Sequence, residues 1–309
     1  MRDTPQKNTN VLCAFDMSYM ETSDKRKLPI VTFHNEENRK NGSVVVLQGI
    51  CDHLDNSSGV FSNLTKRGFS YAAFDWMGAE NIGEGQKKIP LKFDINRHIS
   101  DLEEFLQTIV YPDYPPPYYF LCYDLGCLIA ISALDVINNQ CHRLIGVSPL
   151  FCPLGYKFSG FQHKISLLLD DAGFGRLALR KGRLLLPGGQ SNGKNNVQTS
   201  TEKYQMHYAT PNRRWLARVL DAVQIAHENL QKNKLRFPAL FVAGNNDKLS
   251  DSREIQHFCD NVRLADVITI FGADHDILHA GEYYQKQFWA IFDAFMHKTA
   301  AFQSVHQHL

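Results

Sequence analysis

The chain has 309 residues, of which 44% are hydrophobic, so it is long and apolar enough for one large domain or two small ones. Its formal net charge of +1 gives no support for a nucleic-acid-binding surface or a polybasic membrane anchor. Residues 1–8 contain no apolar stretch, and no run of 18 apolar residues occurs in the chain. We therefore expect neither a secretory signal nor a membrane-spanning helix.

The cysteines give no sign of a disulfide framework or a metal site. There are seven, an odd number, and most of them fall inside apolar runs. No CxxC pair or Cys/His spacing indicates zinc. We expect buried, reduced cysteines in a cytoplasmic protein, and we expect no metal and no organic cofactor.

Strand-like and helix-like runs alternate in the first half of the chain, a pattern typical of a largely parallel sheet. Apolar residues recur at helical spacing from Val60 to Leu64, and Asp94 suits the N-cap of a second amphipathic helix. The strands predicted in this half span residues 44–47, 69–74, 118–121 and 143–148.

The alternation of strand-like and helix-like runs stops between residues 153 and 235, where a Gly-rich polar stretch at 187–193 separates two helical stretches, 164–180 and 212–231. An insertion above the C-terminal edge of a sheet would cover the site there, so we predict a lid. The strand pattern then resumes, and a last amphipathic helix carries Tyr284 to Phe295.

We divide the chain into one core with an insertion. The N-terminal part of the core is expected at 1–152, the lid at 153–235, the C-terminal part of the core at 236–298, and a loose tail at 299–309. The strands predicted in the second part of the core span residues 239–244 and 267–271.

The most informative motif surrounds Asp124. An apolar strand precedes it, small residues flank it, and a helix-like run follows from Leu128. This is the layout of a nucleophile elbow, a sharp strand-to-helix turn that projects one side chain above the sheet. In an esterase that side chain is a serine, whereas here it is an aspartate. Taken alone, Asp124 could equally be an ordinary turn residue.

Two further residues follow later strands. Asp247 comes after the strand at 239–244, and His275 after the strand at 267–271. Nucleophile, acid and then histidine is the chain order of the α/β-hydrolase fold, in which the acid fixes the imidazole tautomer. Singly, Asp247 could be a helix N-cap, and His275 is one of 13 histidines. Their order at successive strand ends predicts a joint site.

An oxyanion hole needs two backbone N–H groups aimed at one point. By position these would belong to Leu125, which follows the elbow residue, and to Ile50, which follows Gln48 and Gly49. The alternative is that Gly49 only ends a strand.

Over residues 25–298 the chain resembles bacterial lysophospholipases and monoacylglycerol-lipase-like α/β-hydrolases. The most specific segments are the Pro-Pro-Pro-Tyr-Tyr entry to the elbow strand at 115–119 and the Phe-Trp-x-x-Phe run at 288–292. The resemblance implies an α/β-hydrolase fold and a cytoplasmic or membrane-peripheral serine hydrolase that cleaves an acyl ester of a glycerol lipid. Its substrate would be a lipid or small molecule, reached through transient contact with a membrane surface.

The departures from this family fall on its functional motifs. The elbow His-Ser-Met-Gly-Gly reads Tyr-Asp-Leu-Gly-Cys at 123–127, and Asp-Trp-Arg-Gly-Gln-Gly reads Asp-Trp-Met-Gly-Ala-Glu at 75–80. The acid and the histidine match at Asp247 and His275. These changes leave the predicted fold intact and weaken the case for ordinary serine hydrolysis.

An aspartate is a poor nucleophile toward an ester carbonyl. A carboxylate leaves with a conjugate-acid pKa of about 3.9, against roughly 15 for an alkoxide-like oxygen. The gap of about 11 pKa units means that the tetrahedral intermediate would expel the carboxylate and return to the substrate. The preference for this return over expulsion of the alkoxide is at most about 15 kcal/mol. Covalent acyl transfer through Asp124 is therefore disfavoured.

Three other roles for Asp124 stay open. It could attack a saturated carbon, as in epoxide hydrolases and haloalkane dehalogenases. The dehalogenase reading fits less well, because Leu125 stands where those enzymes have a halide-binding Trp. Tyr204 and Tyr208 are then candidate proton donors, although both suit packing. Asp124 could instead act as a general base for water. It could also form an ion pair with His275 in a catalytically silent protein that binds a lipid or a partner.

Overall fold

A computed structural model of the chain describes residues 16–37, 39–49, 54–76, 93–151, 213–232 and 234–297. Residues 153–212 of the predicted lid and the predicted tail lie outside the described residues, so the lid stays a prediction. Ile50, Tyr204 and Tyr208 also lie outside them.

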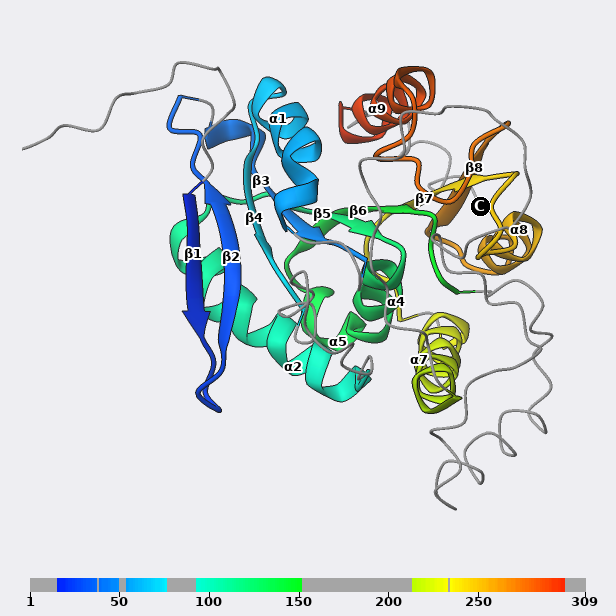
Figure 1. The fold of residues 1–309 in the computed structure, drawn as a ribbon, viewed down its shortest axis with the longest axis horizontal. Helices are drawn as coiled ribbons and strands as arrows, with labels where there is room; N and C mark the ends of the chain where they lie inside the picture. The colour runs from blue at the N-terminus through cyan, green and yellow to red at the C-terminus, as the bar shows by residue number, and fades with distance from the viewer. Residues whose placement is uncertain are drawn as a thin grey trace, which may run out of the picture.

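The described strands form one eight-stranded sheet with the order β1-β2-β4-β3-β5-β6-β7-β8 (Figure 1). The first two strands are antiparallel to their neighbours, and all other pairs are parallel. The strands are β1 (Asp16–Glu21), β2 (Lys27–Phe33), β3 (Ser43–Leu47), β4 (Ser70–Phe74), β5 (Tyr118–Tyr123), β6 (Cys141–Val147), β7 (Ala239–Gly244) and β8 (Ala265–Ile270).

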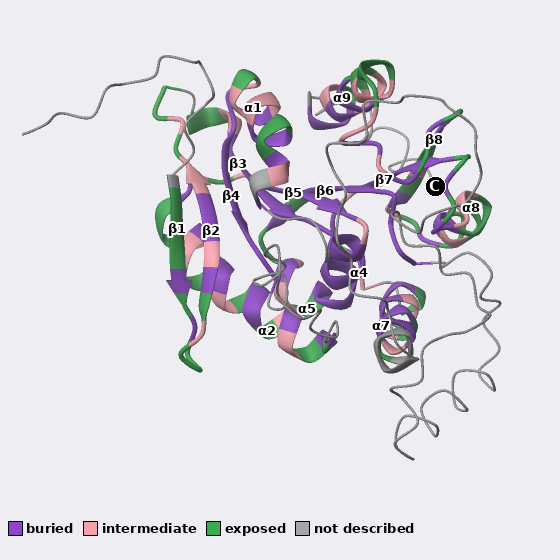
Figure 2. Ribbon diagram, in the orientation of Figure 1, coloured by how far each residue is buried: buried purple, intermediate pink, exposed green. Residues whose placement is uncertain are grey.

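The six parallel strands include every strand that the sequence pattern predicts. Each residue of β3, β4, β5 and β7 is buried, as Figure 2 shows for the centre of the sheet. A parallel sheet is covered by helices on both faces, so its strands read as continuous apolar runs. This burial explains why the strands are recognisable from the sequence.

The helices lie in two layers, one on each face of the sheet (Figure 1). Side chains of α1 and α9 pack in one core, and those of α2, α4, α5, α7 and α8 pack in the other. The α-helices are α1 (Ser58–Lys66), α2 (Ile95–Phe105), α3 (Tyr111–Asp113), α4 (Leu125–Ser132), α5 (Leu134–Ile137), α7 (Arg213–Gln231), α8 (Ser252–Cys259) and α9 (Glu282–His297). Shorter helical turns are the 3-10 helices η1 (Arg39–Asn41) and η2 (Leu54–Ser57) and the π-helix η3 (Leu106–Val110).

Two helices begin at aspartates that accept backbone N–H groups. The Asp94 side chain accepts from Asn96 and Arg97, which confirms it as the N-cap of α2. The Asp251 side chain accepts from Arg253 at the start of α8. Since Asp251 caps α8, the alternative reading of Asp247 as this N-cap is wrong.

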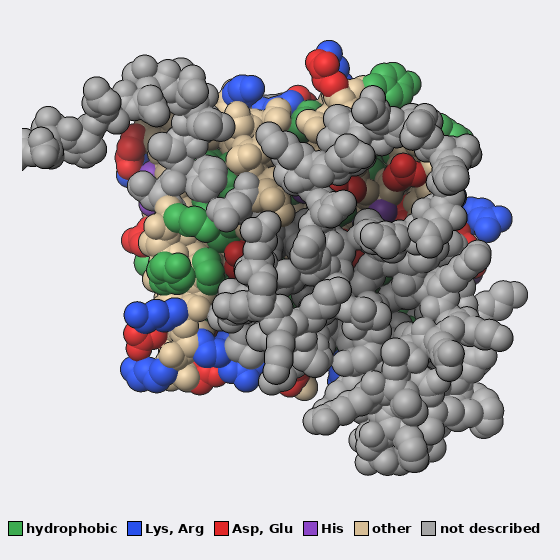
Figure 3. All heavy atoms as spheres, viewed as in Figure 1, with side chains coloured by type: hydrophobic (Ala, Val, Ile, Leu, Met, Phe, Trp, Pro, Cys, Tyr) green, Lys and Arg blue, Asp and Glu red, His purple; other side chains and the backbone are tan. Residues whose placement is uncertain are grey.

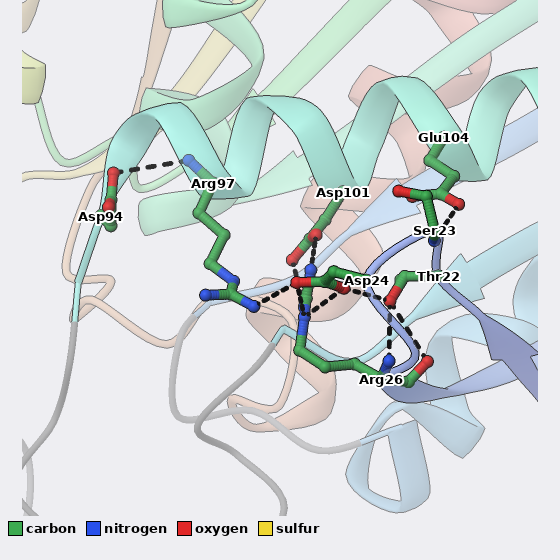
Figure 4. A network of polar contacts seen from close by, with 8 residues as sticks. All are labelled: Thr22, Ser23, Asp24, Arg26, Asp94, Arg97, Asp101 and Glu104. Atoms are coloured by element: carbon green, nitrogen blue, oxygen red, sulfur yellow. Dashed lines mark hydrogen bonds and ion pairs between the residues drawn. The ribbon is translucent and has the colours of Figure 1, made fainter.

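The β1–β2 hairpin is a part of the sheet that the sequence pattern did not predict. Figure 4 shows how its turn is held against α2. Arg26 makes two contacts with the buried carboxylate of Asp101, at 3.0 and 2.5 Å between nitrogen and oxygen. Arg97 bridges to Asp24 at 2.5 Å, and the Ser23 N–H donates to Glu104 at 2.6 Å. These contacts fix the hairpin at the edge of the sheet.

Helix α7, which falls in the C-terminal part of the predicted lid, packs in the helix layer beside α4. The Asn229 side-chain amide donates to the carbonyl oxygens of Ile131 and Ser132, both at 3.1 Å. The Ser132 hydroxyl donates to the Ala222 carbonyl at 3.4 Å. These bonds join α7 to the helix that begins at the elbow.

Gly126 allows α4 to start directly against the end of β3. A Cβ atom at Gly126 would lie 2.1 Å from the carbonyl oxygen of Leu47. Side-chain carbons do not approach backbone oxygen this closely, so only glycine fits without a backbone shift. The contact joins the elbow to the strand that precedes the predicted oxyanion residue Ile50.

We expect Gly126→Ala to lower the free energy of unfolding by about 1–3 kcal/mol or more, because the added methyl group meets backbone. Gly59→Ala on α1 is the matched control, since nothing lies within 4 Å of a Cβ atom there. It should raise stability by roughly 0.5–1 kcal/mol. Denaturant titrations of both variants measure the difference, and equal effects would contradict the role given to Gly126.

Candidate active site

The sharp turn predicted at Asp124 is confirmed. β5 ends at Tyr123, α4 begins at Leu125, and Asp124 joins them with φ 48° and ψ −114°. Non-glycine residues rarely adopt a positive φ, and those that do cluster at functional sites. The Asp124 N–H donates to the Val147 carbonyl on β6 at 3.0 Å, and its side chain is 20% exposed. The carboxylate therefore projects from the C-terminal edge of the sheet.

The three residues predicted to form a joint site lie together. Asp247 follows β7 and His275 follows β8, both at the same sheet edge as Asp124. The His275 Nδ1 atom lies 2.8 Å from the Asp247 Oδ2 atom, and His275 Nε2 lies 3.5 Å from Asp124 Oδ1. The ring therefore has a carboxylate at each nitrogen.

The Asp247 carboxylate is held by its own loop. Its Oδ1 atom accepts the N–H groups of Leu249 at 2.7 Å and Ser250 at 3.0 Å, and its side chain is fully buried. These two bonds leave Oδ2 directed at His275. An aspartate in this arrangement orients the imidazole ring and fixes which nitrogen faces the substrate.

Two asparagines that the sequence reasoning missed join the Asp247 loop to the His275 loop. The Asn245 side-chain oxygen accepts the Gly272 N–H at 2.6 Å. Asn246 donates its backbone N–H to Ala273 at 3.0 Å and its side-chain amide to Asp274. The pair of asparagines directly before Asp247 was the available signal, because Asn commonly bonds neighbouring backbone in turns.

His275 holds a proton at neutral pH. Burial alone lowers the pKa of this imidazole, but hydrogen bonding to Asp124 and Asp247 and their negative charges raise it to about 10. The ring of Tyr123 also lies near it, with 5.7 Å between ring centroids. A histidine with this proton affinity is a donor at pH 7, not a base.

A second polar network organises the chain after β3. The Gln48 side-chain amide donates to the Asp75 carboxylate, which also accepts the Leu54 N–H at 3.1 Å. The Trp76 indole N–H donates to the Gln48 carbonyl at 2.8 Å, and the Ser57 hydroxyl donates to the Gln48 side-chain oxygen at 3.1 Å. All of these side chains are buried. Gln48 and Leu54, two members of this network, lie before and after Ile50 in the sequence.

Of the two predicted oxyanion donors, only Leu125 is among the described residues. It is the first residue of α4, so its N–H has no intrahelical partner and faces the start of the helix. Helix N-termini stabilise negative charge, which suits an oxyanion. The donation by Ile50 stays a prediction.

Four of the seven cysteines lie in the described part of the chain. Cys122, Cys127, Cys141 and Cys259 are all buried. Burial raises the pKa of the first three thiols, which makes them inert. The described residues contain no group of three or more His, Cys, Asp or Glu side chains placed to hold a metal ion. None of the described helices is long and apolar enough to cross a membrane.

The raised pKa of His275 makes a prediction about stability. The folded protein holds this proton up to about pH 10, whereas an unfolded histidine loses it near pH 6.5. The stability that His275 gains from its two carboxylates is thus complete below the unfolded pKa and is lost as the pH rises through the folded pKa. Between these two pKa values, the free energy of unfolding should change by about −1.4 kcal/mol per pH unit.

Denaturant titrations between these two pH values should show this slope in the wild type and lose it in His275→Gln. The control His257→Gln replaces an exposed histidine on α8 and should leave the slope unchanged. Parallel curves for the wild type and His275→Gln would show that His275 is neutral in the folded protein.

Solved structures with the same fold include two lipases and Est1E. The monoacylglycerol lipase of Paleococcus ferrophilus is 18% identical, with a TM-score of 0.63 over 88% of this chain and 99% of that one. A soluble variant of the Saccharomyces cerevisiae monoglyceride lipase with a substrate analogue is 15% identical, with a TM-score of 0.69 over 96% and 99%. Est1E of Butyrivibrio proteoclasticus is 13% identical, with a TM-score of 0.59 over 91% and 97%.

These likenesses establish the predicted α/β-hydrolase fold, with a mostly parallel sheet flanked by helices. No curated protein matches the sequence significantly. The family model described as serine aminopeptidase, S33 (Hydrolase_4) matches residues 38–282, which is more than half of the chain. The chain therefore belongs to the serine aminopeptidase S33 family of α/β-hydrolases.

Proposed function

We propose that this protein hydrolyses an acyl ester of a glycerol lipid, either a lysophospholipid or a monoacylglycerol, by direct attack of water. The family and the lysophospholipase-like segments of the sequence support the reaction class. Two of the solved structures with this fold are lipases for monoacylglycerols, one of them with a substrate analogue bound. The elbow residue decides how such a reaction can proceed.

The observation that carries the proposal is the adjacent acid and base at the elbow. The Asp124 carboxylate and the protonated ring of His275 lie 3.5 Å apart, one able to accept a proton and the other able to donate one. A serine hydrolase needs a neutral histidine to take the serine proton. Here the histidine is already charged, so its role at neutral pH is that of a general acid.

The proposed reaction has one chemical stage without a covalent enzyme intermediate. Asp124 accepts a proton from water as the water oxygen attacks the ester carbonyl. The Leu125 N–H, with that of Ile50, stabilises the negative oxygen that forms. As the carbonyl re-forms, His275 Nε2 donates its proton to the leaving glycerol oxygen. Proton transfer from Asp124 to His275 then restores the starting state.

The direct route avoids the step that disfavours a covalent one. An acyl-aspartate would be a mixed anhydride, and its tetrahedral precursor would expel the carboxylate far more readily than the alkoxide. With water as the nucleophile, neither a hydroxide nor a carboxylate competes as a leaving group once the glycerol oxygen is protonated. The proton on His275 therefore has a direct function in the reaction.

We expect hydrolysis of a monoacylglycerol to stay constant from about pH 7 to pH 9 and to fall above the pKa of His275, near 10. A p-nitrophenyl ester should lack this alkaline fall, because its leaving group needs no proton. Rates measured for both substrates across this range test the general-acid role. A rate that rises with pH for the monoacylglycerol would instead indicate a neutral, basic histidine.

Asp124→Asn should lower kcat by about 100-fold or more, since it removes the general base while keeping the shape of the side chain. The matched control is Asp135→Asn, which neutralises an exposed carboxylate paired with Lys234 away from the site. Steady-state kinetics on lysophosphatidylcholine and a monoacylglycerol measure the effect. Unchanged turnover in Asp124→Asn would contradict the proposal.

A catalytically silent, lipid-binding protein is the second candidate. It is favoured by the ion pair itself, because Asp124 and His275 satisfy each other's charge without a substrate. Asp124→Ser separates the two candidates. If the wild type binds lipid without turnover and the serine variant hydrolyses it, the protein is a binding relative disabled at one position.

A covalent intermediate would overturn the direct route. In His275→Gln, attack of Asp124 on a saturated carbon would leave a stable ester, visible as added mass after incubation with epoxides or haloalkanes. The candidate proton donors for epoxides, Tyr204 and Tyr208, lie outside the described residues. We expect no adduct, and its presence would replace the proposal with an epoxide-hydrolase-like function, ahead of a dehalogenase.

A further inference from the structure

The turn that follows β6 lies between the elbow and the His275 loop and bonds to both. The Asp124 N–H donates to the Val147 carbonyl at 3.0 Å, and the Leu150 N–H donates to the Asp124 carbonyl at 3.4 Å. Between these two residues, the Ser148 hydroxyl donates to the backbone carbonyl of His275 at 2.5 Å. One short turn thus contacts the backbone of both members of the ion pair.

The Ser148 side chain has little freedom. The residue is fully buried, and its N–H donates to the Val242 carbonyl on β7 at 2.8 Å. Its φ of 46° lies in the region that favours glycine, so a serine here is held by its surroundings. The hydroxyl therefore has a fixed position from which it can locate the His275 loop.

The His275 loop is held by contacts from two different segments of the chain. On the Asp247 side, Asn245 and Asn246 join the two loops directly. From the turn after β6, the Ser148 hydroxyl reaches the backbone carbonyl of His275 itself. The His275 carbonyl also accepts the Ile277 N–H at 3.0 Å, but that bond lies within the loop and does not fix its position relative to the elbow.

We propose that Ser148 is a positioning residue that sets the separation between His275 Nε2 and Asp124 Oδ1. Its hydroxyl holds the backbone of His275 at a fixed distance from the same turn that anchors Asp124. The effect of Ser148 on turnover rests on the proposed function, whereas its effect on the proton affinity of His275 rests on the geometry alone.

Four carboxylates face or neighbour His275, and Ser148 governs the contact with one of them, Asp124. Asp124 lies on the elbow, Asp247 follows β7, and Asp274 and Asp276 flank the histidine in its own loop. The ring of Tyr123 also contacts the histidine ring. A loosened Ser148 bond should weaken the Asp124 contact and leave the Asp247 bond in place.

NMR titration of the histidine rings tests the proposal without relying on activity. In Ser148→Ala we expect the proton affinity of His275 to fall about tenfold or more, a shift of at least about one pKa unit. The low-field Nδ1 proton bonded to Asp247 should persist. The control Ser43→Ala removes an equally buried serine hydroxyl that donates to the Pro115 carbonyl at 2.7 Å, and it should leave the titration of His275 unchanged.

Ser148→Gly provides a second variant if Ser148→Ala fails to fold. Glycine adopts a φ of 46° without strain and also lacks the hydroxyl, so it removes the bond while easing the backbone. It should show the same fall in proton affinity. A His275 titration within about 0.3 pKa unit of the wild type in the folded variants would overturn the positioning role.

Kinetics then separate this inference from the proposed function. With an active wild type, the variants should lose about 10- to 100-fold in kcat with little change in KM, because the misplaced donor acts only in the transition state. If the wild type is inactive but the titration shifts, the proposed function fails and the positioning role stands. If the wild type is active with the expected pH profile but the His275 titration does not shift in the variants, the proposed function stands and the positioning role of Ser148 fails.

Discussion

A single imidazole ring between two carboxylates is the interaction on which the rest of this site depends. Each carboxylate reaches His275 from the end of a different strand, so both contacts of the ring depend on how β5, β7 and β8 are arranged. Burial removes most of the water that would otherwise solvate His275 and Asp247, whereas Asp124 is partly exposed. One positive ring between two carboxylates offsets part of their charge and leaves a net negative charge at the edge of the sheet.

The charge balance distinguishes this site from a serine triad on the same fold. In a serine triad the only charged residue at rest is the acid, and positive charge on histidine appears during the reaction. Here the positive charge is present at rest because the elbow residue is itself negative. In the proposed reaction, the ester meets a polarised pair instead of a neutral hydroxyl, and a negatively charged substrate group would be repelled unless it lay away from Asp124.

Figure 3 shows that acidic and basic side chains are interspersed on the described part of one face of the molecule. This agrees with the near-zero net charge, which gave no case for a polyanionic partner. The proposed function therefore depends on local charge. That charge arises from three side chains that the fold brings together, and not from the overall composition.

Much of this arrangement could be predicted from the sequence because it depends on local patterns. The buried parallel strands are continuous apolar runs, Asp94 precedes a helical pattern, and Asp124, Asp247 and His275 each follow a strand. Physical rules connect each of these patterns to structure over a few residues.

Other features depend on contacts between distant residues. The β1–β2 hairpin was missed because its strands are partly polar and lie at the edge of the sheet, so they lack a continuous apolar run. The hairpin is held by Arg26 and Asp101, which are far apart in sequence. The role of Ser148 is invisible in the chain, where it merely ends a strand before a proline. Its partner His275 is 127 residues away. The protonation of His275 likewise follows from burial and distances that only the folded chain provides.

The elbow has an evolutionary consequence. Its unusual backbone is held by the β6 turn and by the close approach of Gly126 to Leu47, and not by the side chain at position 124. That side chain is partly exposed, so exchanging it requires no repacking of the core. Natural selection can therefore act on the chemistry at this position while the fold around it stays constant. A lineage built on this scaffold can gain, lose or replace an activity through one residue without rearranging its core.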